Sequence, residues 1–164
     1  FALRMEPVCN DIYVNDVLKQ TTAFLDNEIR FRNIELIWRL NPDIPTIQSD
    51  ASQIQQVILN LFNNAIDALD RNGHITVTTG YEPEHDMVSI SIRDDGPGMD
   101  KEVQRRIFDP FFTTKKVGEG TGLGLSISYS IISKLGGSIR FESEVGQGTE
   151  FIILLPVKHH DRKE

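Results

Sequence analysis

Cysteine is almost absent from this 164-residue chain, in which Cys9 is the only one. The chain therefore cannot form an internal disulfide or a cysteine-rich metal site, which is consistent with a reducing compartment. Long apolar runs are also lacking: no stretch approaches the ~18 residues that a membrane span needs. No signal-peptide pattern is present either. These absences predict a cytoplasmic chain that makes no membrane contact of its own.

Basic charge is scarce as well, because 17 Lys and Arg face 24 Asp and Glu, for a net charge of -7. A general nucleic-acid binder usually has a basic footprint, so nucleic acid is not an expected partner. The length fits one domain with a core large enough for independent folding. The chain begins with Phe1 rather than Met, which suggests a piece of a longer protein.

One stretch, Gln53–Leu69, has a strong helical pattern, with Asp50 or Ser52 available as its cap and Gly73 as its end. Apolar residues at helical spacing form a broad arc and cover much of the remainder: Ile54, Val57, Ile58, Leu61, Ala65, Ala68 and Leu69, then Leu59, Phe62 and Ile66. A narrow stripe of mostly uncharged polar residues is left: Gln53, Gln56, Asn60, Asn64 and Asp67. A helix that is apolar nearly all round is buried, and buried amides need partners. We therefore expect the stripe to face a polar ligand in a cavity; the alternative is a solvated amide face.

Periodicity predicts the remaining elements. Helices are expected over Val14–Arg32, Asp100–Ile107 and Thr121–Leu135, and strands over Ile34–Leu40, Thr46–Gln48, His74–Tyr81, Met87–Arg93, Ser138–Ser143 and Thr149–Val157. Helices together with a largely antiparallel sheet favour a two-layer α/β sandwich of the α+β kind.

Four clusters of characteristic residues follow the central helix, and three of them contain glycines. Asp94–Gly98 comes directly after a strand, where glycines let the backbone approach a ligand and a carboxylate can accept from an amine such as that of adenine. Taken alone, an acidic turn is the more common explanation. Gly118–Leu125 leads into a helix, whose free N–H groups and dipole bind phosphate, although it is not the lysine-bearing P-loop pattern.

The other two clusters are less specific. Phe108–Lys116 holds three phenylalanines in an aperiodic loop, and a long loop in a compact domain is usually functional. Exposed aromatics there suggest a hinge, a lid anchor or a partner surface, with a satellite core as the alternative. Lys115 or Lys116 could neutralise a terminal phosphate, although a solvated lysine pair is the default. Gly146–Thr149 is by itself an ordinary hairpin turn.

The order and spacing of these clusters resemble the catalytic and ATP-binding domain of sensor histidine kinases, in the GHKL superfamily with gyrase and MutL. Asn60–Ala65 resembles the N box, Asp94–Gly98 the G1 box, Phe108–Phe112 the F box, Gly120–Leu125 the G2 box and Gly146–Thr149 a further glycine box. The resemblance covers roughly Val14–Val157, and Asn64–Ala68 with Pro110–Lys115 resemble the nitrogen-regulation-like subgroup. It implies a GHKL fold, in which a mixed, mostly antiparallel sheet of about five strands packs on three helices.

This resemblance implies ATP and Mg²⁺ as cofactors. Asn64 would hold Mg²⁺ through its side-chain oxygen, and Asn60 would lie near the metal or the phosphates. Asp94 would accept from the adenine amino group, and Gly96 and Gly98 would shape the wall under the base.

The resemblance also implies that residues 108–120 form a lid over ATP, that backbone groups of the G2 box contact phosphate, and that Thr149 lies near adenine. Many family members carry Lys or Arg where Asp67 stands, so Lys115 or Arg71 is the candidate to supply charge to phosphate. The expected binding residues are Asn60, Asn64, Asp67, Asp94, Gly96, Gly98, Phe112, Thr114, Lys115, Gly120, Thr121, Gly122, Leu123, Gly124, Leu125 and Thr149, with Asn60, Asn64 and Lys115 as the catalytic candidates.

Three segments follow from the resemblance: a remnant of a dimerisation helix and linker over residues 1–13, the catalytic domain over 14–157, and a charged tail over 158–164. The family's phosphorylated histidine lies on a separate helical domain. None of the four histidines, His74, His85, His159 and His160, lies in such a context. We therefore expect a monomeric fragment that binds ATP without phosphorylating itself.

The partners that the resemblance implies are the histidine-bearing dimerisation domain of the same protein, which is expected to be a homodimer at full length, and a response-regulator receiver domain. The whole protein would then belong to a bacterial two-component system. The cytoplasmic chain could be part of a membrane-anchored sensor.

Three functions are weighed. In the leading one, the γ-phosphoryl group of ATP passes to a histidine and then to a regulator aspartate, mainly through positioning and charge neutralisation. A gyrase- or MutL-type ATPase would place a general-base Glu one turn before the metal Asn, where this chain has Asn60 and so no carboxylate to activate water. A non-catalytic nucleotide-sensing module, with Phe111 and Phe112 as its docking surface, is separated from the first by a phosphotransfer assay.

Overall fold

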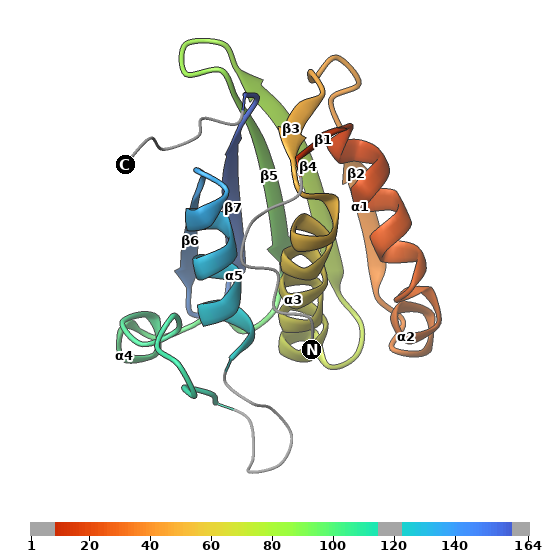
Figure 1. Ribbon diagram of the computed structural model, residues 1–164. Coiled ribbons are helices and arrows are strands. Elements are labelled where there is room, and N and C mark those ends of the chain that lie inside the picture. The colour runs from red at the N-terminus through yellow and green to blue at the C-terminus, as the bar shows by residue number, and fades with distance from the viewer. Residues whose placement is uncertain (1–8, 115–122, 159–164) are drawn as a thin grey trace.

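The computed structural model describes residues 9–114 and 123–158 (Figure 1). A five-stranded sheet has the order β2–β4–β5–β7–β6. Its strands are β2 (Glu35–Arg39), β4 (His74–Glu82), β5 (Met87–Asp94), β7 (Gly148–Pro156) and β6 (Ser138–Glu144). β2 runs parallel to β4, and every other neighbouring pair is antiparallel. The expected mixed, mostly antiparallel sheet is confirmed.

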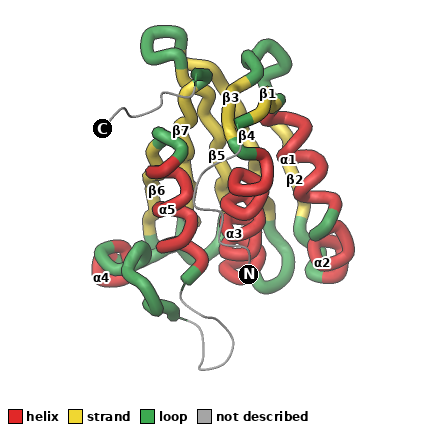
Figure 2. Tube along the Cα trace, viewed as in Figure 1, coloured by secondary structure: helices red, strands yellow, loops and turns green. Residues whose placement is uncertain are grey.

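Three helices lie against one face of this sheet, as Figures 1 and 2 show. They are α1 (Val14–Ala23), α3 (Ala51–Leu69) and α5 (Gly124–Lys134), with α3 packed between the other two. The shorter helices α2 (Asp26–Phe31) and α4 (Lys101–Gln104) lie at the edges of this layer. The architecture is therefore the predicted two-layer α/β sandwich.

The central helix α3 is buried along most of its length, as its sequence predicts. Its buried residues are Ile54, Val57, Ile58, Leu61, Phe62, Ala65 and Ile66. Asp50 caps the helix, because its Oδ1 accepts from the N–H groups of Ser52 at 3.1 Å and Gln53 at 3.2 Å. Of the two proposed caps, the carboxylate is thus the one used.

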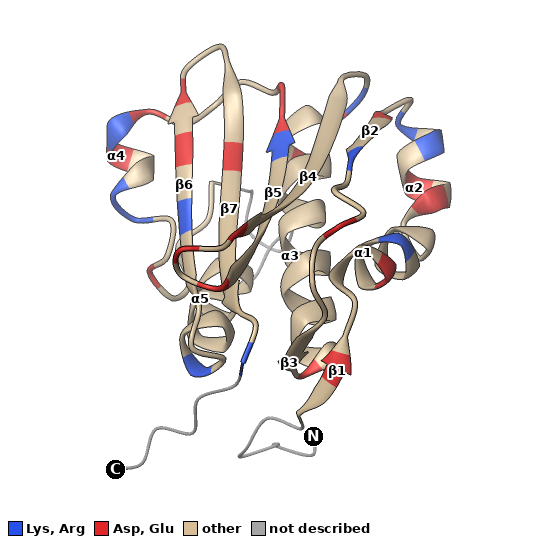
Figure 3. Ribbon diagram, turned by 90° about the horizontal axis from the view of Figure 1, so that it is seen from above, with Lys and Arg blue, Asp and Glu red and all other residues tan. Residues whose placement is uncertain are grey.

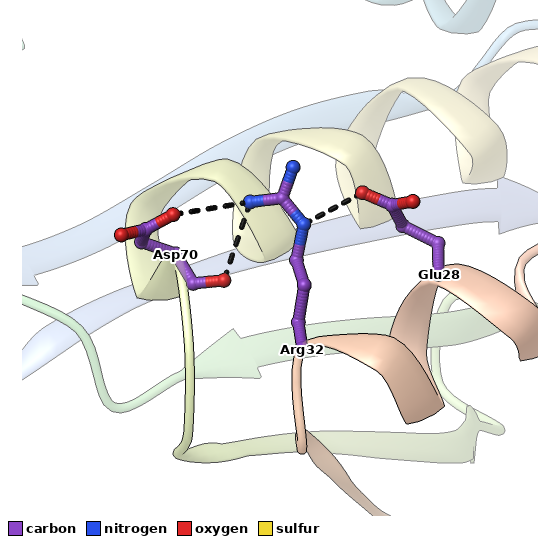
Figure 4. A network of polar contacts seen from close by, with 3 residues as sticks. All are labelled: Glu28, Arg32 and Asp70. Atoms are coloured by element: carbon purple, nitrogen blue, oxygen red, sulfur yellow. Dashed lines mark hydrogen bonds and ion pairs between the residues drawn. The ribbon is translucent and has the colours of Figure 1, made fainter.

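The helix ends at Asp70 rather than at Gly73, since Asp70 already has a positive φ of 57°. Arg32 holds this end, as Figure 4 shows: its Nη1 donates to the Asp70 carbonyl oxygen at 3.2 Å and to Asp70 Oδ1 at 3.4 Å. Its Nε donates to Glu28 Oε1 at 2.6 Å. The guanidinium group therefore joins the end of α3 to the end of α2, and a non-glycine residue keeps the left-handed turn.

The predicted single helix over Val14–Arg32 is wrong, because the chain forms α1 and α2 with a break after Ala23. Two threonine hydroxyls bond back to helix carbonyls just before the break, Thr21 to Val17 O at 2.6 Å and Thr22 to Lys19 O at 3.0 Å. Such back-bonding bends helices. The apolar spacing continues across the break, so periodicity alone cannot reveal it.

A second, two-stranded sheet pairs β1 (Asn10–Ile12) with β3 (Ile47–Ser49) in antiparallel register. The sequence predicts β3, one residue early, but predicts no strand at β1, because three residues are too few to show alternation. The helix predicted over Asp100–Ile107 is also shorter: Asp100 accepts from Val103 N–H at 2.9 Å, and α4 ends at Gln104. Ile107, the predicted last residue of this helix, is buried but lies in the turn that follows α4.

Charged positions recur along β5, β7 and β6, as the coloured segments of the ribbon in Figure 3 show. In the antiparallel register, Arg93 of β5 lies opposite Glu150 of β7, which lies opposite Glu142 of β6. One sheet face therefore packs on helices while the other faces solvent, as antiparallel sheets allow. Across the described ranges, none of the helices combines the length and the apolar character that crossing a membrane requires.

Candidate functional site

A cavity of about 640 Å³ opens at one end of the sandwich. Its walls are the C-terminal half of α3, the end of β5, the loop after β5, the beginnings of α5 and β7, and residues 112–114. The polar stripe of α3 contributes Asn60, Asn64 and Asp67, whereas its first half does not reach the cavity. The predicted polar face thus forms a cavity wall only over the last two turns of the stripe.

Asp94, the last residue of β5, brings a buried carboxylate to the cavity, with 5% of its surface exposed. Burial raises the pKa of this carboxyl group, although backbone N–H groups of Gly96 and Thr149 donate to it and oppose the shift. The Gly96 N–H lies 2.9 Å from Asp94 Oδ1. A buried carboxylate that keeps acceptor capacity suits a ligand with an N–H donor.

The loop after β5 is fixed to the β6–β7 hairpin by close backbone approach. Gly98 has a φ of +71°, and a Cβ there would overlap the Glu144 carbonyl oxygen. Gly148 has a φ of +99°, and a Cβ there would overlap the Asp94 carbonyl oxygen. In addition, the Gly146 N–H donates to Pro97 O at 2.7 Å. The first and last glycine clusters, far apart in sequence, therefore meet around the strand end that presents Asp94.

The opposite wall is the amide row of α3. Asn60 is half-buried, and its Nδ2 donates to Gly124 O at 3.1 Å and to Ser128 Oγ at 3.2 Å, both on α5. Asn64, one turn further, is half-buried at the cavity, and Asp67 is exposed there. This wall offers amide and carboxylate oxygens, the ligand atoms that hard divalent cations prefer.

No cluster of three or more His, Cys, Asp or Glu that could hold a metal ion is found in the described part of the chain. Mg²⁺ typically keeps several waters and takes only one or two protein oxygens together with substrate phosphates. The sparse oxygen set on α3 therefore fits an ion that arrives with a phosphate ligand, and it does not fit a permanent structural metal.

Asp95 follows Asp94 in the sequence, but its carboxylate is bound by His74, which is not part of the cavity lining. His74 donates from its backbone N–H to Asp95 Oδ1 at 2.7 Å, and its Nδ1 lies 2.8 Å from Asp95 Oδ2, while its Nε2 lies 3.3 Å from Glu35. The hydrogen bond and charge of Asp95 raise the pKa of His74. Burial opposes ionisation of Asp95, but the His74 hydrogen bonds outweigh it and lower the pKa of that carboxyl group.

The phenylalanine cluster divides into three roles. Phe108 packs with Tyr129 of α5 and Phe141 of β6, with ring centroids 5.4 Å and 5.8 Å apart. Phe112 lines the cavity under the Arg106 guanidinium, which lies 4.7 Å from its ring centroid. Phe111 is 74% exposed and has a φ of 66°. Phe108 and Phe112 therefore both pack against the main hydrophobic core, whereas Phe111 is exposed.

Ten of the predicted binding residues line the cavity: Asn60, Asn64, Asp67, Asp94, Gly98, Phe112, Thr114, Gly124, Leu125 and Thr149. Gly96 and Leu123 are described but are not part of the lining; the Gly96 N–H turns to Asp94 instead. Lys115, Gly120, Thr121 and Gly122 lie outside the described residues, as do residues 115–120 of the expected lid. The ligand roles of all these residues stay predictions.

Sequence reasoning missed several wall residues. They are Asn63, Ala68, Pro97, Met99, Asp100, Val103, Ile107, Thr113 and Phe151. The helical pattern places Ala68 on the buried arc. In the structure, however, the last turn of α3 lies beside the loop after β5, and Gly96 of that loop approaches the Ala68 carbonyl oxygen. Residue spacing could have identified three of them. Val103 and Ile107 lie four residues apart in the predicted helix, and Phe151 follows Thr149 by two residues in the predicted strand, so each pair is expected on one face.

Comparisons with known proteins identify the family to which a domain with this cavity belongs. Residues 49–159 match the family model described as histidine kinase-, DNA gyrase B- and HSP90-like ATPase. Sporulation kinase E of Bacillus subtilis (strain 168) is 38% identical over 148 residues, which are 90% of this chain and 20% of that protein. The chain thus spans about a fifth of the length of this curated relative.

Solved structures agree. The nucleotide-free catalytic domain of histidine kinase ThkA superposes with a TM-score of 0.82 at 34% identity, covering 92% of this chain and 97% of that one. ThkA has also been solved in complex with the response regulator protein TrrA, with a TM-score of 0.81 at 29% identity, covering 95% and 44%. Full-length ShkA in complex with AMPPNP gives 0.84 at 28% identity, covering 97% and 33%.

A two-layer sandwich with its cavity between a helix amide row and a glycine-bounded strand end defines the GHKL fold class. The chain belongs to the histidine kinase-, DNA gyrase B- and HSP90-like ATPase family, and it is a domain of the sensor histidine kinase type. The finer assignment to the nitrogen-regulation-like subgroup stays a prediction.

Proposed function

We propose that this chain is the ATP-binding catalytic domain of a sensor histidine kinase. It would transfer the γ-phosphoryl group of ATP to a histidine on a separate helical dimerisation domain, for relay to an aspartate of a response regulator. One observation carries this proposal: a single cavity has the buried Asp94 carboxylate on one wall and the oxygen-bearing side chains of Asn60, Asn64 and Asp67 on another. Adenine offers an amino group to the first wall, and a magnesium triphosphate offers a cation to the second.

In this proposal Asp94 accepts from the adenine amino group and so selects the base. The loop that contains Gly98 and Met99, together with Val103 and Ile107, supplies the apolar surface beside Asp94. Asn64 contributes its side-chain oxygen to Mg²⁺, and Asn60 lies close enough on the same helix face to act on the metal or the phosphates. The bound ion would neutralise charge that develops on the transferred phosphoryl group.

Phosphotransfer fits the residues better than hydrolysis does. Asn60 stands where gyrase-type ATPases place a general-base Glu, and both of its N–H bonds go to α5. An amide cannot take a proton from water as a carboxylate can. Catalysis would then consist of holding the phosphoryl group in line with an acceptor that is brought to the cavity.

The acceptor is proposed to come from another domain. His74 begins β4 and is held by Asp95 and Glu35, and His85 lies in the β4–β5 turn, so neither belongs to a helix. His159 and His160 lie outside the described residues. We further propose the receiver domain of a response regulator as the downstream partner, and residue 157 as the last residue of the catalytic domain. Its start, expected at residue 14, is proposed to lie before β1 instead. Residues 10–12, which pair with β3, are part of the folded unit.

The test uses γ-labelled ATP with Mg²⁺ and the chain alone, then with a separately produced dimerisation domain of the same kinase. We expect label only in the mixture, on the added domain, and of the acid-labile, alkali-stable kind. Asp94→Asn should reduce labelling, whereas Asp43→Asn, at an exposed position outside the cavity, should not. Hydrolysis by the chain alone at ~1 s⁻¹, within the usual enzyme range, would overturn the proposal in favour of an ATPase. A mixture that binds ATP without labelling would favour a nucleotide-sensing module.

A further inference from the structure

Ser128 lies on α5 one turn after Gly124, and none of its surface is exposed. Its hydroxyl donates to the Gly124 carbonyl oxygen at 2.8 Å, and its oxygen accepts from Asn60 Nδ2 at 3.2 Å. A serine hydroxyl has one proton and two lone pairs, so it can do both. Ser128 does not line the cavity itself, but it contacts a residue that does.

The orientation of the Asn60 amide follows from chemistry. The amide atom that lies 3.1 Å from the Gly124 carbonyl oxygen must be the nitrogen, because a carbonyl has no proton to donate. The nitrogen carries two protons, and its two partners, Gly124 O and Ser128 Oγ, use both. The side-chain oxygen is therefore the polar atom that Asn60 has left to offer to the cavity.

We propose that Ser128 is a positioning residue that acts through Asn60. With the Gly124 carbonyl it holds the amide nitrogen on α5, so that Asn60 presents an oxygen, and not an NH₂ group, to the magnesium and phosphate end of the ligand. This inference rests on the proposed function, because it assigns that end of the cavity to Mg²⁺.

Removing the Ser128 hydroxyl should loosen the orientation of the Asn60 amide. In Ser128→Ala one Asn60 N–H loses its acceptor in a buried place, and a buried unpaired donor is costly. The Gly124 carbonyl alone then holds the amide nitrogen on α5, so the amide turns more readily to orientations in which its NH₂ group, and not its oxygen, reaches the cavity. An NH₂ group cannot ligate a cation, so the loss should depend on the metal. A merely structural serine would instead lower stability and affect ATP binding equally with and without Mg²⁺.

The experiment compares the wild-type chain, Ser128→Ala and the matched control Ser130→Ala, which alters an exposed serine of the same helix. Calorimetry measures ATP affinity in Mg²⁺ and in EDTA. We expect Ser128→Ala to weaken binding about tenfold in Mg²⁺, as for one lost hydrogen bond to a charged system, and to leave binding in EDTA unchanged. Ser130→Ala should match the wild type in both.

Two further readouts test the route through Asn60. In an Asn60→Ala background, Ser128→Ala should cause no additional loss, because the residue through which it acts is gone. Without any ligand, the Asn60 side-chain NH₂ protons should exchange faster with solvent in Ser128→Ala than in the wild type, as seen by NMR. Should Ser128→Ala not fold, Ser128→Cys keeps the volume with only a weak hydrogen-bonding group and must show the same metal-dependent loss.

The outcomes are distinguishable. A wild-type chain whose ATP affinity is the same with and without Mg²⁺ overturns the proposed metal site and this inference together. A wild type that needs Mg²⁺, with a Ser128→Ala variant that matches it, overturns the inference alone. An equal loss in Mg²⁺ and EDTA, or losses that add to those of Asn60→Ala, shows a structural serine and also overturns it.

Discussion

Replacing Asp94 by Asn should weaken ATP binding and at the same time stabilise the fold. The side chain is 5% exposed, and backbone N–H groups of Gly96 and Thr149 already donate to it. Asparagine keeps one acceptor oxygen, whose two lone pairs can accept from the backbone N–H groups of Gly96 and Thr149. Its NH₂ group then takes the position of the second carboxylate oxygen and meets the adenine amino group donor to donor.

The expected loss in ATP affinity is about 2–3 kcal/mol, the size of a hydrogen bond that involves a charged group, or about 30- to 150-fold in Kd. Stability should move in the opposite direction. Because burial raises the pKa of Asp94 in the folded state, the ionised carboxylate destabilises the fold at pH 7, and this cost disappears as the pH falls through the folded-state pKa. The stability advantage of Asp94→Asn should therefore be present at pH 7 and shrink in acid.

Isothermal calorimetry with Mg·ATP measures the first effect, and urea unfolding at pH 7 and at acid pH measures the second. Asp43→Asn, the same chemical change at an exposed residue outside the cavity, is the control for both. An Asp94→Asn variant that binds ATP within threefold of the wild type would refute the assignment of adenine to this wall. If Asp94→Asn and the wild type had equal urea midpoints at pH 7, the inference that burying the ionised Asp94 carboxylate destabilises the fold would be refuted.

Three further predictions concern other parts of the fold. Asn64→Ala should abolish the Mg²⁺-dependent part of ATP affinity while circular dichroism stays unchanged; titrations that coincide with and without Mg²⁺ in the wild type would contradict the metal assignment. The raised pKa of His74 means that its charged contact with Asp95 stabilises the fold below about pH 6.5 and is lost as the pH rises through the folded-state pKa. Urea midpoints of wild type and His74→Gln should thus differ at low pH and converge at alkaline pH. Thr79→Val should cost about 1–3 kcal/mol in urea unfolding, because the buried hydroxyl donates to Asn15 and accepts from a backbone N–H.

Some of the site could be predicted because local chemistry reveals it. Asp94 ends an alternating strand and precedes glycines, so its place at a strand end follows from the sequence alone. The uncharged stripe on a helix that is otherwise apolar indicates a cavity wall through side-chain type and spacing alone. Strand pairing then decides how the pieces meet: Asp94 lies opposite Thr149, and the two glycine clusters close around them.

Other features needed the tertiary structure, because their causes are distant in sequence. The helix break after Ala23 does not interrupt the apolar pattern, and the end of α3 at Asp70 depends on Arg32, 38 residues earlier. The Asn60 amide nitrogen is held by the Gly124 carbonyl and Ser128, which lie 64 and 68 residues later.

By itself, the sequence determined which residues are apolar, where strands can end, and which boxes identify the family, since these depend on side-chain type and short-range spacing. Only the tertiary structure decided which half of the polar stripe reaches the cavity and which atom of Asn60 is left to face it. A hydrogen bond between α3 and α5 exists only after the sheet has brought the two helices together.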